Sequence, residues 1–216
     1  RCRTTSRNEF IFYADRLIRL VIEYGLGFLP FNECTVTTPA GEQYAGVGFV
    51  SNLCGVSIIR SGEAMENALR QCCSAIKIGK ILIHRSGDSG SALAYEKLPY
   101  DISQRQVFLM DPIVATGHSV CSAIEVLIKH RGVDESNIIL VSLIAAPQGL
   151  RRVCTRYPQL KVITSEIDRC AAEDGTLRPG IGDFGDRYFG TLNSSEENVI
   201  VLSPRATDSG SDSQAH

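Results

Sequence analysis

The chain has 216 residues, of which 44% are hydrophobic and 21% are charged, and its formal net charge is -2. This length and composition fit one α/β domain with a sizeable core. A charge this close to zero gives no reason to expect nucleic acid or a membrane surface as a partner. No apolar run approaches the roughly 20 residues that cross a bilayer, and no signal-peptide pattern opens the chain. Because the chain begins with Arg1 rather than Met, we expect further residues upstream.

The eight cysteines are spread along the chain without a CxxC pair. Cys72 and Cys73 are adjacent within a helical pattern, and Cys54 and Cys121 lie in apolar contexts typical of a core. This placement favours reduced thiols that pack as small hydrophobic residues, as in the cytosol, over a disulfide framework.

The first predicted element is a helix that follows a capping box, Ser6-x-x-Glu9. Apolar side chains then recur at helical spacing and predict the packed face, namely Phe10, Tyr13, Ala14, Leu17, Leu20, Val21 and Tyr24. Residues 34–50 alternate threonines with apolar residues around Pro39 and Gly41, which predicts a β-hairpin.

A strand at residues 53–59 is followed by a short turn and a helix at about residues 64–75. Arg60 stands where this strand ends, so its guanidinium could hold a pyrophosphate in a bidentate way. A surface arginine that caps a loop is an equally good interpretation of this stretch alone. The next strand is predicted at residues 78–84, and the small, loose residues 85–94 follow it.

The centre of the sequence is VFLMDPIVATGHSVCSAIEVLIKH, residues 107–130. Four apolar residues predict a buried strand that runs into Asp111, and a helical pattern begins at Ser119. A Thr-Gly turn between a strand and a helix N-terminus is suited to a phosphate, because backbone N–H groups and the helix dipole converge on the anion. Thr116 and Ser119 add hydroxyl donors, and Asp111 can face a sugar hydroxyl or a metal ion.

Further strands at residues 137–146 and 160–164 alternate with a helix at residues 147–157. Such alternation predicts a mostly parallel sheet that is covered on both faces. From residue 194 to residue 216 the composition shifts to Ser, Asp, Glu and Gly, which predicts a disordered tail.

Residues 179–191 read PGIGDFGDRYFGT and follow no periodic core pattern. Their glycines would let the backbone approach a flat ligand, whose polar edge could pair with free N–H and C=O groups. A purely structural glycine loop is the alternative.

Three segments together resemble the eukaryotic type of uracil phosphoribosyltransferase: residues 55–70 (GVSIIRSGEAMENALR), residues 111–117 (DPIVATG) and residues 179–191. The resemblance implies the type I phosphoribosyltransferase fold, a parallel sheet flanked by helices, over residues 1–193. It also implies a flexible β-arm at residues 85–99 and a small hood that carries the uracil loop at residues 165–191.

The same resemblance implies the reaction uracil + phosphoribosyl pyrophosphate (PRPP) → UMP + pyrophosphate, in which Mg²⁺ is held by PRPP rather than by protein ligands. The residues implied in catalysis are Arg60, Arg85, Asp111 and Asp183. The residues implied in PRPP binding are these four and Pro112, Ile113, Val114, Ala115, Thr116, Gly117, His118 and Ser119. The residues implied in uracil binding are Leu177, Gly182, Asp183 and Phe184. Activation by GTP, a homodimer or homotetramer, and a cytoplasmic or also nuclear location are further expectations.

Two binding segments depart from the family pattern. His118 stands where the family turn usually has a glycine, so it would be strained if that position needs a positive φ. Thr176 and Arg178 replace an aromatic and an aliphatic residue before the uracil loop. These changes make a non-catalytic relative that binds PRPP or a nucleotide the alternative function. A third possibility is the transferase-like part of a longer kinase fusion, although the kinase loop GxxxxGK[ST] does not occur in this sequence.

Overall fold

The computed structural model describes residues 1–50, 52–86 and 90–191, and it does not describe the side chains of residues 85–92. The predicted tail at residues 194–216 therefore lies outside the described residues. The tip of the predicted arm at residues 85–99 also lies outside them, so its flexibility stays a prediction.

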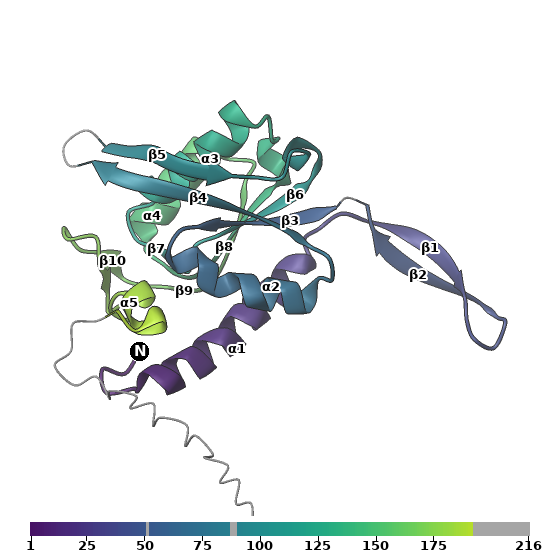
Figure 1. Ribbon diagram of the computed structural model, residues 1–216, viewed down its shortest axis with the longest axis horizontal. Coiled ribbons are helices and arrows are strands. Elements are labelled where there is room, and N and C mark those ends of the chain that lie inside the picture. The colour runs from purple at the N-terminus through teal and green to yellow at the C-terminus, as the bar shows by residue number, and fades with distance from the viewer. Residues whose placement is uncertain (51, 87–89, 192–216) are drawn as a thin grey trace, which may run out of the picture.

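A seven-stranded sheet forms the centre of the described chain (Figure 1). Its strands follow the order β5-β4-β3-β6-β8-β7, and β9 also pairs with β8. All pairings are parallel except that of β5 with β4, so the expected mostly parallel sheet is confirmed. The strands are β3 (Leu53–Ile58), β4 (Lys77–Ser86), β5 (Gly90–Lys97), β6 (Gln106–Met110), β7 (Ile113–Val114), β8 (Ile138–Ala145) and β9 (Lys161–Ile167).

Helices cover both faces of this sheet. One face carries α1 (Arg7–Leu26) and α2 (Glu66–Cys72), and the other carries α3 (His118–Glu125) and α4 (Pro147–Arg156). Shorter helical turns span Ser61–Met65, Ile102–Gln104 and Glu135–Asn137, and a π-helical turn at Val126–His130 extends α3. Among the described helices, none is long and apolar enough to span a membrane.

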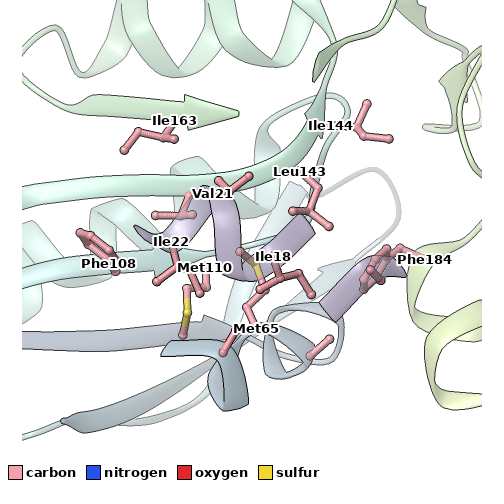
Figure 2. Packing of buried hydrophobic residues seen from close by; sticks show 14 of the residues in the cluster. Ile18, Val21, Ile22, Met65, Phe108, Met110, Leu143, Ile144, Ile163 and Phe184 are labelled. Atoms are coloured by element: carbon pink, nitrogen blue, oxygen red, sulfur yellow. The ribbon is translucent and has the colours of Figure 1, made fainter. Parts of the chain in front are cut away.

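The strand before the Thr-Gly turn shows why the core has two halves. Phe108 and Met110 point to the side of α1 and α2, whereas Val107 and Leu109 point to the side of α3 and α4. Successive side chains of a strand face opposite sides, so a continuous apolar strand fills both layers. Figure 2 shows Phe108 and Met110 packed beside residues of α1, among them Ile22.

Helix α1 begins as expected, because the side chain of Ser6 accepts from the backbone of Glu9 and the side chain of Glu9 accepts from the backbone of Ser6. The predicted packed face is only partly right, since Tyr13, Leu20 and Tyr24 are 63–65% exposed. The helix is apolar over more than one face, so spacing alone does not select the row that meets the sheet. The buried row is Phe10, Ala14, Ile18, Val21, Ile22 and Gly25.

Two small hairpins lie outside the main sheet. The predicted hairpin is confirmed as β1 (Phe31–Thr37) paired with β2 (Gln43–Phe49), and it extends away from the body (Figure 1). The second joins β10 (Cys170–Ala171) to β11 (Leu177–Arg178) and precedes α5 (Phe184–Phe189). All eight cysteines are free thiols, as expected, and burial raises the pKa of Cys54 to about 12.

Candidate functional site

One cavity of about 370 Å³ lies where the loops after β3 and β6 meet the segment after β10. In open α/β sheets ligands bind at the carboxyl ends of the strands, and both of these loops begin there. The cavity brings together most of the residues predicted for the site. Its predicted lining residues are Arg60, Asp111, Ile113, Val114, Ala115, Thr116, Gly117, His118, Ser119, Leu177, Gly182, Asp183 and Phe184.

Gly117 forms the bend of the Thr-Gly turn. It has φ 79° and ψ 2°, and it is the N-cap of α3. A Cβ atom built on it would lie 2.9 Å from the carbonyl oxygen of Gly149, so both the conformation and the space require glycine. His118 is already in the helix, and among the described non-glycine residues only Ala75 has a positive φ. The substitution at His118 therefore puts no strain on the turn.

The imidazole of His118 takes part in a small network at this turn. Its Nδ1 lies 3.0 Å from the hydroxyl of Thr116 and 2.9 Å from the guanidinium of Arg152, which also donates to the carbonyl oxygen of Thr116 at 2.6 Å. A guanidinium has only donors, so Nδ1 accepts and the ring proton lies on Nε2. Arg152 was missed from the sequence, because it is 34 residues from His118 and on another helix.

Asp111 and Pro112 lead into the turn but are placed differently. Asp111 is half-buried, lines the cavity and accepts from the backbone N–H of Ile113 at 3.4 Å. Pro112 is buried and does not line the cavity. Its carbonyl oxygen accepts from the backbone N–H groups of Leu143 and Ile144, so Pro112 fixes the turn to β8.

Arg60 reaches across to the glycine-rich segment near the end of the chain. Its guanidinium donates to Asp186 at 2.6 Å and to the hydroxyl of Thr191 at 2.7 Å, and it lies 3.9 Å from Asp183. Hydrogen bonds from Thr191 and then from Arg60 lower the pKa of Asp186. The cation predicted to hold pyrophosphate is thus paired with carboxylates in this structure.

The loop of residues 177–184, which we call the base loop, closes the cavity. Leu177 and Phe184 are buried, and Gly182 has φ 78°. Asp183 caps α5 by accepting from the backbone N–H of Asp186 at 2.8 Å. The ring of Phe184 lies 5.5 Å from that of Phe10, and Figure 2 shows it beside α1.

The segment between β10 and β11 also contributes side chains to the cavity. Asp174 and Thr176 also line it, and the hydroxyl of Thr176 donates to Asp174 at 2.6 Å. From the sequence, Thr176 was expected only as a departure from the family pattern, and Asp174 was not expected at the site. Arg85 belongs to β4, but its side chain lies outside the description, so its role stays a prediction.

A Thr-Gly turn at a helix N-terminus and a glycine-rich loop line one cavity at the edge of a parallel sheet, which is the arrangement that a phosphate-bearing ligand with a flat group would need. The family model "Uracil phosphoribosyltransferase" matches residues 1–191. The uracil phosphoribosyltransferase of Dictyostelium discoideum is 54% identical over 88% of each chain. The chain therefore belongs to the uracil phosphoribosyltransferase family, and the expected fold is confirmed.

Two further comparisons place the chain. The uridine/cytidine kinase UKL1 (chloroplastic) of Arabidopsis thaliana is 62% identical over 86% of this chain. This chain spans only 38% of the length of that relative. The solved structure of the AQ2163 protein from Aquifex aeolicus matches with a TM-score of 0.78 at 24% identity, over 89% of this chain and 91% of that one, and shares the fold.

Proposed function

We propose that this domain transfers the phosphoribosyl group of PRPP to uracil and releases pyrophosphate. The bond from uracil N1 to ribose C1 forms, the bond from C1 to pyrophosphate oxygen breaks, and the N1 proton leaves. The observation that carries the proposal is the single cavity lined by the Thr-Gly turn, Arg60 and the base loop. Membership of the family supports it.

The turn would hold the 5′-phosphate end of PRPP. The N-terminus of α3 supplies backbone N–H groups and a favourable dipole, and Thr116 and Ser119 supply hydroxyls beside them. Asp111, at the end of β6, would accept hydrogen bonds from the ribose hydroxyls. The cavity wall between the phosphate end and the ribose would be formed by Ile113, Val114 and Ala115.

The leaving pyrophosphate would be stabilised by Arg60 and Arg85. Charge builds on this group as the C1 bond breaks, and fixed cations favour that change over the ground state. Arg60 would first exchange Asp186 and Thr191 for phosphate oxygens. This exchange would couple PRPP binding to the segment that follows the base loop.

Uracil would bind against Leu177, Gly182 and Phe184, largely through backbone groups. A positive φ at Gly182 exposes the backbone of the loop without a side chain in the way. Asp183 is 62% exposed on its side chain and lines the cavity, so it is the candidate to take the proton from uracil N1.

We expect Mg²⁺ to enter this site as an ion carried mainly by the substrate. Among the described residues, no group of three His, Cys, Asp or Glu side chains could hold a metal ion. Asp111 and Asp183 could each add one carboxylate to an ion that phosphate oxygens mainly hold. When bound, Mg²⁺ would neutralise charge on the pyrophosphate.

We also expect two or more copies of this chain to associate, as a homodimer or a homotetramer. Large apolar side chains on α1 and on the β1–β2 hairpin are at least 59% exposed, which is typical of a surface that another chain covers. These side chains are Tyr13, Leu20, Tyr24, Phe31, Tyr44, Val47 and Phe49. Sedimentation analysis would show a single monomeric species if this expectation is wrong.

Activation by GTP and a cytoplasmic or nuclear location stay predictions. The name of the Arabidopsis relative places that protein in the chloroplast, so it gives no support to a cytoplasmic or nuclear location for this chain. The names of several relatives also mention uridine kinase activity. We assign no such activity to these residues, because the sequence contains no GxxxxGK[ST].

The test is UMP formation from uracil and PRPP with Mg²⁺, with and without GTP, using the unmodified chain and a Thr116→Val variant. Turnover that the variant loses would support the proposal. Binding of PRPP by calorimetry without any turnover would favour the non-catalytic relative instead. A chain that binds neither PRPP nor UMP would contradict both functions.

A further inference from the structure

The buried carboxylate of Asp168 holds the base loop through a hydrogen bond. Asp168 is 4% exposed and follows β9, and its backbone N–H donates to the carbonyl oxygen of Ala145 at 2.8 Å. Its side chain accepts from the backbone N–H of Gly180 at 2.8 Å and from the guanidinium of Arg1 at 2.8 and 3.2 Å. A carboxylate this deeply buried is stable only when it is paired and hydrogen-bonded, and here both oxygens have partners.

Gly180 is the residue of the base loop that Asp168 contacts. It lies between Leu177 and Gly182, and it has φ 69°. The guanidinium of Arg1 also donates to its carbonyl oxygen at 3.1 Å. Both backbone groups of one residue are therefore held, which fixes where the neighbouring base-binding residues stand.

Other contacts of the first seven residues reach α5, the helix that follows the loop. Arg187 donates to the carbonyl oxygen of Cys2 at 3.0 Å and to that of Ile181 at 2.7 Å. Arg7 donates to the carbonyl oxygen of Tyr188 at 3.2 Å. Residues 1–7 thus contact the loop at Gly180 and helix α5, which follows the loop, at Arg187 and Tyr188.

We propose that Asp168 and residues 1–7 form a clamp in which Arg1 and Asp168 are positioning residues for the base loop. This inference rests on the proposed function, because it concerns the loop expected to bind uracil. The clamp acts mainly on the affinity for uracil, because Asp183 is the one base-loop residue that is also expected to contact PRPP. The phosphate turn has its own supports, namely the hydrogen bond from Cys121 to Gly117 and the contacts of Arg152.

The test compares Arg1→Met with a matched control, Arg19→Met, in the full chain. Arg19 forms an exposed ion pair with Glu23 on α1, so the control removes an arginine pair away from the loop. We expect Arg1→Met to raise the KM for uracil about tenfold and to change the KM for PRPP less than about twofold, because it removes hydrogen bonds to a charged group. The control should change neither.

A second readout does not need activity. Hydrogen exchange of residues 177–184 should become faster in Arg1→Met and in Asp168→Asn, and it should stay unchanged in Arg19→Met. Unchanged exchange in the loop, or an equal rise of both KM values, would overturn the clamp. Faster exchange together with no binding of uracil or UMP by the unmodified chain would retain the clamp and contradict the proposed function.

Discussion

The phosphate turn, residues 111–119, and the base loop, residues 177–184, line the same cavity but are built in different ways. The bend of the turn is closed by a hydrogen bond from Cys121 to Gly117, four residues apart in the sequence. The base loop is held by Arg1, which is 179 residues from Gly180. The bend of the turn therefore follows from neighbouring residues, whereas the base loop depends on contacts that only folding brings together.

The strongest test of the phosphate turn is Gly117→Ala. The backbone at this position has a positive φ, which alanine adopts only with strain, and the added Cβ would meet the carbonyl oxygen of Gly149 at 2.9 Å. We therefore expect PRPP affinity to fall about a hundredfold or more. Gly132→Ala is the matched control, because Gly132 also has a positive φ but its Cβ would meet no atom within 4 Å. Calorimetry with PRPP should show near-normal affinity for the control. Equal losses in both variants would show that close packing at the turn is unimportant.

Arg152→Leu tests the long-range support that the turn does have. The variant loses the hydrogen bonds from Arg152 to Thr116 and His118, so we expect the KM for PRPP to rise about tenfold while the KM for uracil changes little. Arg151→Leu changes the adjacent, exposed arginine of α4 and serves as the control. An unchanged KM for PRPP in Arg152→Leu would mean that the turn is held by its own backbone alone.

Acid should remove the stability that Asp168 contributes where it holds the base loop. Burial raises the pKa of Asp168, but the hydrogen bonds from Arg1 and Gly180 outweigh it and lower that pKa below the ordinary value of 3.8. A carboxyl group whose pKa is lowered by folding contributes stability that is fully present when the pH is above its ordinary pKa. This contribution is lost as the pH falls through the lowered pKa of the folded protein. Between pH 6 and pH 3 we expect the Tm of the unmodified chain to fall about 2–4 °C more than that of Asp168→Asn. Parallel curves from calorimetric scans would contradict this expectation.

Asp186→Asn tests whether the ion pair with Asp186 of α5 keeps Arg60 from binding the ligand. Removing the charge of Asp186 weakens its 2.6 Å ion pair with Arg60. The guanidinium of Arg60 then leaves Asp186 at a lower cost in free energy when it binds pyrophosphate. We expect PRPP to bind about threefold more tightly, within the range of an exposed ion pair. Glu23→Gln, which weakens the pair on α1, is the control. Weaker binding of PRPP would mean that Asp186 orients Arg60 for the ligand.

The smallest effect should come from His118→Gly. His118 has no positive φ, and Arg152 holds the carbonyl oxygen of Thr116 directly, so the turn keeps its shape without the imidazole. We expect kcat and the KM for PRPP to change less than about twofold. A large gain in turnover would instead mean that His118, which departs from the family pattern, impairs the reaction in the unmodified chain.

The sequence predicted those parts of the protein whose partners lie within a few residues. The capping box of α1, the β1–β2 hairpin, the buried strand before Asp111 and the glycine turn are all confirmed. Each depends on local φ and ψ preferences and on short-range hydrogen bonds. The site residues that the family resemblance implied also line one cavity, apart from Pro112, which is buried, and Arg85, whose side chain is not described.

Only the tertiary structure decided which distant groups meet. The sequence did not reveal that α1 leaves Tyr13 and Tyr24 exposed, that Arg152 supports the turn, or that Arg1 and Asp168 hold Gly180. The choice of partner for a long charged side chain depends on where the elements pack, and residue spacing does not encode it. For that reason the bend of the phosphate turn could be predicted, and the distant supports of the turn and of the base loop could not.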